Sequence, residues 1–73
     1  MLSLNDVTVG KSVYVSEILT KDIIKERMLA LGITKGTNIE VIRKGPKNNL
    51  TVFSIRGVMI ALRCEESRLI MVE

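Results

Sequence analysis

The feature that most restricts the fold of this chain is the segment Ile24–Thr37. Strong helix formers fill Lys25–Leu31, and Gly32 follows where a helix C-terminus needs a residue that tolerates positive φ. Gly36 is the third residue of Thr34–Thr37, the position of a type II turn that also requires positive φ. The sequence therefore predicts one helix that stops at Gly32 and a tight turn that leads directly into a strand.

The rest of the chain has the alternating or β-branched patterns of short strands. These predicted strands are Ser12–Ser16, Asn38–Arg43, Leu50–Ile55, Val58–Arg63 and Leu69–Val72. Met1–Val9 is expected to be an extended lead-in, Arg56–Gly57 a tight hairpin connection and Glu65–Ser67 a single helical turn. Short strands in so small a chain must curl to hide their edges. We therefore expect one mainly β domain over residues 1–73, a small closed five-stranded barrel with one short α-helix, in which Gly57 has a structural role.

The predicted helix carries an apolar stripe with two exceptions. At helical spacing the stripe contains Ile23, Ile24, Met28, Ala30 and Leu31. Arg27 falls inside this stripe, whereas Leu29 falls on the polar face. Arg27 has two interpretations: its stem lies along the core and its head reaches backbone carbonyls or a carboxylate such as Glu40, or it anchors a partner. We favour the structural role.

Leu29 is the candidate contact residue of the helix, because the face opposite a core should be polar. The helix is expected to protrude from the barrel beside the turn that follows it. This turn would offer free backbone groups to a partner. An aliphatic anchor ringed by charges is typical of a small contact patch. The partner-binding residues predicted from this pattern are Lys25, Glu26, Leu29, Gly32, Lys35 and Gly36.

The side chains available for chemistry exclude most kinds of site. Histidine is absent and Cys64 is the single cysteine, so the usual zinc spacings and a histidine-activated nucleophile are missing. Glu65 and Glu66 are adjacent carboxylates whose side chains should point apart, which makes a poor acid–base couple. We therefore expect no enzyme, no cofactor and no metal site.

Three features bear on the compartment. The longest purely apolar run, Val58–Leu62, is far shorter than the roughly 20 residues that span a bilayer. Met1–Asp6 lacks the basic start and apolar middle of a signal peptide. A lone cysteine also fits a reducing compartment. The expected location is the cytoplasm, without membrane insertion.

The net charge of +3 leaves a second function open, binding of nucleic acid by a small basic barrel. Basic residues at strand ends and in one loop could form such a surface: Arg43, Lys44, Lys47, Arg56 and Arg63. Platforms for single strands normally stack bases on exposed aromatics, and the chain offers only Tyr14 and Phe53. We therefore rank solvated edge protection above a nucleic-acid surface. A metal-binding carrier is a third and weaker alternative.

Two segments resemble a known family. Arg27–Gly36 is similar to the segment R-L-x-x-L-G-[LI]-x-P-G of the FeoA family, and Ile55–Arg63 is similar to its V-R-G-x-x-[IL]-A-L-R segment. Lys35 departs from the first pattern, since the family often has proline there. Ser67 stands where the family usually has alanine. With further landmarks near both ends, the resemblance covers essentially the whole chain.

The resemblance implies an SH3-like small barrel and a cytoplasmic accessory of FeoB, the membrane transporter of ferrous iron that carries a GTP-binding domain. On this basis we expect an interaction module that binds the cytoplasmic part of FeoB, with weak self-association left open. The module also resembles the C-terminal domain of iron-dependent repressors of the diphtheria-toxin-repressor type. Those repressors carry a DNA-binding helix-turn-helix ahead of this module, and this chain is too short to contain one as well.

The first prediction concerns iron itself. The absence of histidine and the single Cys64 leave only carboxylates, which bind ferrous iron weakly when they are exposed to solvent. Anaerobic calorimetry with ferrous iron is therefore expected to show no stoichiometric complex tighter than micromolar. A tighter complex would overturn this prediction.

Overall fold

The structure is a computed structural model that describes residues 2–20 and 22–73. Its strands are β1 (Leu2–Ser3), β2 (Ser12–Ile18), β3 (Asn38–Lys44), β4 (Leu50–Ile55), β5 (Val58–Arg63) and β6 (Ile70–Val72). Its helices are α1 (Asp22–Ala30), the single turn α2 (Cys64–Ser67) and the 3₁₀ turns η1 (Leu4–Asp6) and η2 (Pro46–Asn48). The predicted helical turn near Glu65 is confirmed by α2.

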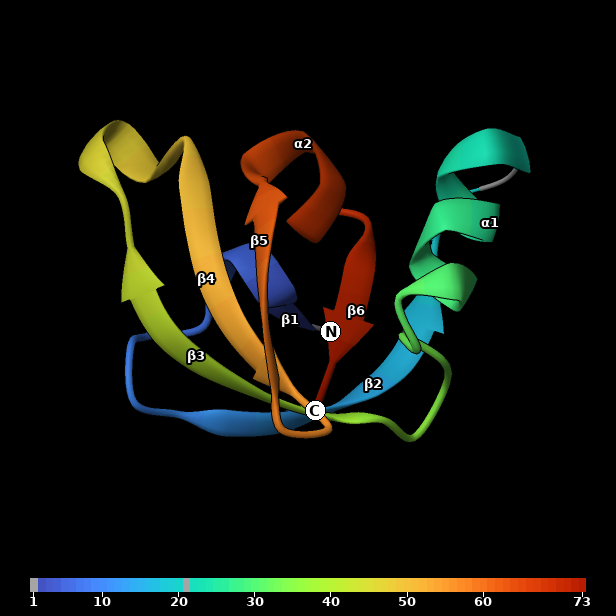
Figure 1. Ribbon diagram of the computed structural model, residues 1–73, viewed down its shortest axis with the longest axis horizontal. Helices are drawn as coiled ribbons and strands as arrows, with labels where there is room; N and C mark the ends of the chain where they lie inside the picture. Colours follow the sequence, from blue (N-terminus) through green and yellow to red (C-terminus); the bar gives the residue numbers. More distant parts are fainter. Residues whose placement is uncertain (1, 21) are drawn as a thin grey trace.

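The strands form one six-stranded antiparallel sheet in the order β1-β6-β2-β3-β4-β5. Figure 1 shows this sheet curling around the core, with α1 standing to one side. The prediction of a mainly β fold with one short helix is confirmed, but the prediction of five strands and of closure is wrong. Leu2 and Ser3 add a sixth strand by pairing with Val72 and Met71, and β1 and β5 remain unpaired ends. A strand of two residues is too short to show a periodic pattern, so the sequence did not predict it.

Two irregularities in the ladder help the sheet to curl. The register shifts between Val15 and Glu17 where β2 meets β6, and between Val41 and Arg43 where β3 meets β4. An extra residue on one strand bends that strand and increases the local twist. These two irregularities therefore help the sheet to curl with its apolar face toward the core.

The core is aliphatic and built mainly from alternate strand residues. Its buried side chains are Leu4, Val7, Val15, Met28, Ile33, Ile39, Val41, Phe53, Ile55, Leu62, Ile70 and Val72. The inward positions expected for Val15, Ile39 and Val41 are confirmed. On β5 the predicted inner face is only partly correct, since Leu62 is buried whereas Val58 is exposed. Val58 follows the hairpin turn directly, beyond the edge of the core.

The glycine positions predicted from the sequence are confirmed. Gly32 ends the helical segment with φ +85°, and the N–H of Ile33 donates to the carbonyl of Met28 at 2.9 Å. Gly36 has φ +89°, and the N–H of Thr37 donates to the carbonyl of Thr34 at 3.0 Å, as a type II turn requires. The chain therefore passes from α1 into β3 with little freedom between them.

The predicted apolar stripe of α1 is wrong in most of its members. Met28 is buried and Leu31 half-buried, but Ile23 is 80% exposed and Ile24 and Ala30 are also exposed. The stripe assumed that the core lies along the whole helix, whereas α1 projects past the core and packs through its C-terminal half (Figure 1). The predicted first residue of the helix, Lys21, lies outside the described residues. In the part of the chain that the structure describes, no helix has the length and apolar character needed to cross a membrane.

The turn before β3 gives a prediction about stability. Gly36→Ala is expected to lower the free energy of unfolding by about 1–2 kcal/mol, because a side chain at left-handed φ is strained even where space is open. The neighbouring change Lys35→Ala, at an exposed position, should stay within about 0.5 kcal/mol of the wild type. Urea denaturation of the two variants measures both values. Equal stability of the two variants would contradict the assigned turn.

Candidate partner-binding surface

Arg27 ties α1 to α2. Its guanidinium Nη1 forms an ion pair and hydrogen bond with Oε2 of Glu66, whose side chain is only 10% exposed. The other carboxylate oxygen, Oε1, accepts the backbone N–H of Arg63 at 3.0 Å. The prediction that Arg27 reaches a carboxylate is met by Glu66, and the expectation that this carboxylate is Glu40 is wrong. The geometry supports the structural role proposed for Arg27, with a partner 39 positions away that no local pattern indicates.

The turn Thr34–Thr37 is fixed to β2 and to Gly32 by hydrogen bonds. The N–H of Gly36 donates to the carbonyl of Val15 at 2.7 Å, and the N–H of Val15 donates to the carbonyl of Thr37 at 2.9 Å. The hydroxyl of Thr37 accepts the N–H of Thr34 at 3.0 Å and donates to the carbonyl of Gly32 at 3.3 Å. The expectation of free backbone groups at this turn is therefore not met at Thr34, at Thr37 or at the N–H of Gly36.

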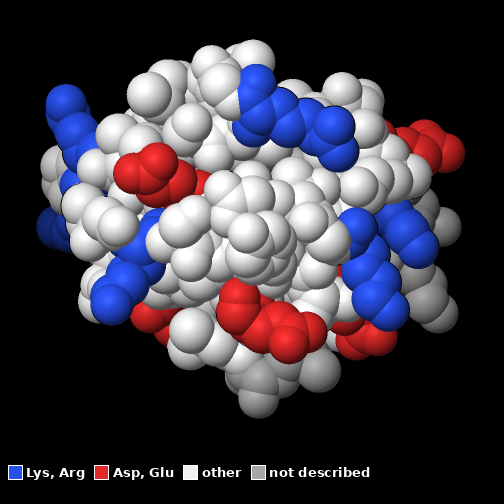
Figure 2. All heavy atoms as spheres, turned by 90° about the horizontal axis from the view of Figure 1, so that it is seen from below, with Lys and Arg blue, Asp and Glu red and all other residues white. Residues whose placement is uncertain are grey.

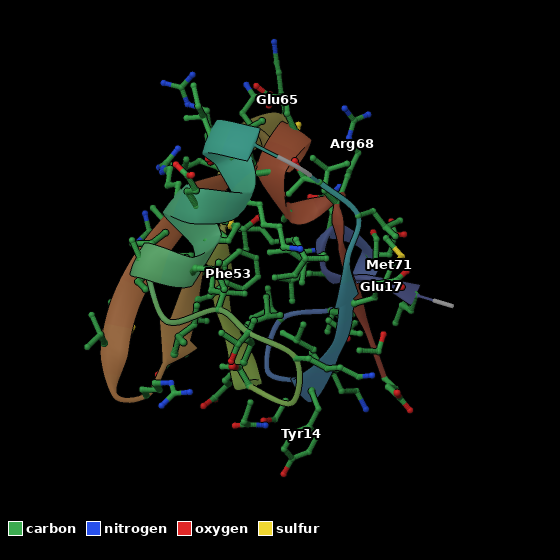
Figure 3. The ribbon with its side chains drawn as sticks, turned by 90° about the vertical axis from the view of Figure 1, so that its right-hand side faces the viewer. Tyr14, Glu17, Phe53, Glu65, Arg68 and Met71 are labelled. Atoms are coloured by element: carbon green, nitrogen blue, oxygen red, sulfur yellow. The ribbon has the colours of Figure 1, made fainter. Side chains whose placement is uncertain are left out.

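A groove of about 310 Å³ lies between α1, the end of β2 and this turn. We call it the Leu29 groove; it is lined by Ser16, Glu17, Ile18, Lys25, Leu29, Thr34 and Lys35. Leu29 is 48% exposed, and it is flanked by two lysines and one glutamate. Figure 3 faces this side of the molecule, with α1 on the left and Glu17 on β2 at the right.

The Leu29 groove contains three of the six predicted contact residues, namely Leu29, Lys25 and Lys35. Glu26 is exposed on the helix but does not line the groove. Sequence reasoning missed Glu17 and Ile18, because it ended the strand at Ser16. In the sequence, polar Glu17 and apolar Ile18 continue the alternation of the preceding strand residues, and this signal could have predicted the longer strand that the structure shows.

A second cavity of about 340 Å³ lies on the other side of the same turn. We call it the Arg56 cavity; it is lined by Gly36, Thr37, Asn38, Glu40, Ser54, Arg56 and Gly57. It contains Gly36 of the predicted contact set, whereas Gly32 lies at its margin against the stem of Arg56. The carboxamide of Asn38 is held by the hydroxyl of Ser12 at 2.9 Å. Four of the six predicted contact residues thus line these two hollows, three in the groove and one in the cavity, and the hollows share one turn.

Cys64 has a neighbour that suppresses its reactivity. Its thiol donates to Oε1 of Glu65 at 3.3 Å, and this hydrogen bond, with desolvation, raises the pKa of Cys64. The pKa of the Glu65 carboxyl is lowered because the carboxylate accepts a hydrogen bond from its own backbone N–H and another from the thiol. A protonated thiol is a poor nucleophile and a poor metal ligand. Among the described residues, no group of three or more His, Cys, Asp or Glu side chains is arranged to hold a metal ion.

The basic side chains do not form one surface with the aromatic residues. Arg56 lies at the β4–β5 turn, whereas Arg63 lies at the far end of β5. Phe53 is buried, and the exposed Tyr14 projects from the end of the molecule opposite α2 (Figure 3). Figure 2 shows acidic groups between the basic ones on the face viewed from below. Arg43, Lys44 and Arg63 do lie at one end of the sheet, but no exposed aromatic side chain accompanies them for base stacking, which weakens the nucleic-acid alternative.

Comparison with known proteins gives a match along nearly the whole chain. A family model described as the FeoA domain matches residues 2–73. The FeoA-like protein from Clostridium acetobutylicum has 29% identity and a TM-score of 0.90, and the match covers 99% of this chain and 84% of that one. Among curated proteins, no relative matches.

Two further structures share the fold. FeoA of Stenotrophomonas maltophilia, solved with zinc and described as an SH3 domain protein, has 23% identity and a TM-score of 0.87, over 100% of this chain and 91% of that one. A manganese-dependent transcriptional repressor has 17% identity and a TM-score of 0.88, over 97% of this chain and 40% of the repressor. The six-stranded sheet is therefore an SH3-like module that also occurs inside a longer protein.

The ion pair of α1 gives a prediction that separates structure from contact. Arg27→Ala should lower the free energy of unfolding by about 1–2 kcal/mol, since it leaves the largely buried Glu66 carboxylate without its cation. The side chain of Arg27 is 56% exposed, so solvent screening limits the effect.

The matched control is Arg43→Ala, which removes an exposed arginine that makes no ion pair with the described residues. It should change stability by no more than about 0.5 kcal/mol. Thermal and urea denaturation measure both variants. If Arg27→Ala unfolds like the wild type but no longer binds a partner, the residue is a contact and its structural role is wrong.

Proposed function

The chain belongs to the FeoA domain family, and we propose that it is a non-enzymatic accessory protein of ferrous iron uptake that binds the cytoplasmic region of a FeoB-type transporter. The observation that carries the proposal is the Leu29 groove, a hollow with one exposed aliphatic side chain among charges. The S. maltophilia relative, described as a candidate activating factor of bacterial ferrous iron transport, supports the same biological setting. The protein would act in the cytoplasm, where that region of the transporter lies.

Leu29 is suited to an anchoring contact because of its surroundings. It lies in a groove, so a partner side chain that enters would contact both Leu29 and the neighbouring Ile18. Contacts that are enclosed and lose their water contribute most of the binding energy of an interface. The charged rim of Lys25, Lys35 and Glu17 would orient the partner and accelerate encounter. A complementary partner surface would present an aliphatic side chain with acidic neighbours.

The groove is also supported by rigid elements. One wall is the end of β2, where Glu17 and Ile18 pair with Met71 and Ile70 of β6. Another wall is the turn that Gly36 joins to Val15 by a hydrogen bond. A preorganised surface loses little conformational entropy when a partner binds, so more of the contact energy appears as affinity.

Exposure alone does not distinguish Leu29. Ile23 is 80% exposed on the same helix, and Met59 on β5 is 63% exposed, yet neither lines one of the cavities described above. Single exposed apolar residues are ordinary on protein surfaces. The argument for Leu29 therefore depends on the groove around it.

The proposal is tested by titrating the isolated cytoplasmic region of a FeoB transporter from the same source with the wild-type protein. A saturable complex is expected, and its affinity should weaken as salt concentration rises, because the rim of the groove is charged. The absence of binding at high protein concentration would contradict the proposed function.

Leu29→Ser should weaken this complex by at least about tenfold, which corresponds to roughly 1.4 kcal/mol. The matched control is Ile23→Ser, which removes a more exposed aliphatic side chain from the same helix outside the groove. Both variants should unfold within about 0.5 kcal/mol of the wild type, as exposed substitutions usually do. Equal binding by the two variants would remove Leu29 from the interface, and a large loss of stability in Leu29→Ser would place it in the core.

A further inference from the structure

Arg56 has a backbone conformation that arginine rarely adopts. Its φ is +54° and that of Gly57 is +81°, so the two residues form the left-handed two-residue turn between β4 and β5. Such turns favour Asn, Asp or Gly at both central positions, because these residues tolerate positive φ with less strain. Strained residues of this kind gather at functional sites, which makes the arginine side chain worth explaining.

The side chain of Arg56 lies beside Gly32 and has no carboxylate partner among the described residues. Its Cδ and Nε lie 3.6 Å from the position that a Cβ on Gly32 would occupy, so the stem rests against the end of the α1 segment. Across the described ranges, the ion pair that the structure forms is that of Arg27 with Glu66. Glu40 lines the same cavity as Arg56 but does not pair with it. Arg56 is exposed, with its stem beside Gly32, and its guanidinium is available for an external acceptor.

We propose that the Arg56 cavity binds a carboxylate side chain of a protein partner. The guanidinium supplies paired N–H donors whose spacing matches a carboxylate. Ser54, which pairs with Glu40 across β3 and β4, adds a hydroxyl donor on the same wall of the cavity. Glu40 lines the same cavity and offsets the charge of Arg56, so a doubly charged group such as phosphate gains little extra attraction there and loses more of its hydration than a carboxylate does. The site therefore selects a single carboxylate over a phosphate.

The cavity lies where a partner in the Leu29 groove could reach it. Thr34 and Lys35 line the groove, whereas Gly36 and Thr37 line the cavity, so the two hollows are separated only by one tight turn. In this respect the inference rests on the proposed function, with an acidic residue of the partner as the added element. The partner would cross the turn with an aliphatic side chain on one side and a carboxylate on the other.

If Arg56 had a purely structural role, the opposite effect on stability would be expected. A cation beside a helix C-terminus stabilises the helix through the macrodipole, and its removal should lower the melting temperature. Arg56→Asn separates the two roles, because asparagine suits the left-handed turn while it removes the charge and the fork. Under the binding role, the melting temperature stays level or rises while affinity falls.

The test compares Arg56→Asn, Arg56→Lys and the control Arg43→Asn with the wild type. Binding to the isolated FeoB cytoplasmic region should weaken at least about tenfold for Arg56→Asn, which corresponds to roughly 1.4 kcal/mol. Arg56→Lys keeps the charge without the fork and should fall between Arg56→Asn and the wild type. Arg43→Asn removes the same charge outside the cavity and should stay within about twofold of the wild type. Unchanged affinity in Arg56→Asn, or a melting temperature that falls without a loss of affinity, would overturn the proposal.

A second arm does not depend on the transporter. Titration with sodium acetate, against sodium phosphate at matched ionic strength, is followed by the amide resonances of Gly36 and Gly57 and by the Nε–H resonance of Arg56. Saturable shifts with acetate that exceed those with phosphate, and that vanish in Arg56→Asn, support a carboxylate site even if the transporter does not bind. No saturable shift, or equal shifts with phosphate, would overturn the site while leaving the Leu29 groove to its own test.

Discussion

The hydrogen bonds that join the turn Thr34–Thr37 to β2 are the constraint on which both surface hollows depend. Gly36 donates to Val15, and Val15 donates back to Thr37, so the turn is attached to the centre of the curled sheet. The hydroxyl of Thr37 extends the network to Gly32 at the end of the α1 segment. This hydrogen-bonded turn thus fixes how the end of the helical segment sits relative to the start of β3, and it separates the Leu29 groove from the Arg56 cavity.

The helix α1 is attached at few points, and this explains its unusual surface. Met28 anchors its C-terminal half in the core, and Arg27 reaches across to Glu66 of α2. Ile23 and Ile24, in the first turns, remain exposed because the core ends before it reaches them (Figure 1). Among the side chains of α1 whose burial is described, Met28 alone is buried, so this helix presents most of its surface to solvent. That surface includes the wall of the groove around Leu29.

Both hollows are assembled from segments that lie apart in the sequence. The groove combines β2, α1 and the turn before β3, and the cavity combines that turn with β3 and the β4–β5 hairpin. Each is mixed in charge, with lysine or arginine facing a single glutamate. Such surfaces suit recognition of a protein with its own pattern of charges better than binding to a uniformly anionic polymer.

The sequence by itself determined the local structure of this protein. The glycine positions, the inward residues of β2 and β3 and the Arg56–Gly57 hairpin follow from φ preferences and from a period of two, which act within a few residues. Only the tertiary structure decided which face of α1 meets the core, that Glu66 rather than Glu40 pairs with Arg27, and that Leu2 and Ser3 add a sixth strand. It also brought Glu17 to Leu29 and Arg56 to Gly32. These contacts join residues far apart in the chain, and their free energy depends on how the sheet curls, which no local pattern encodes.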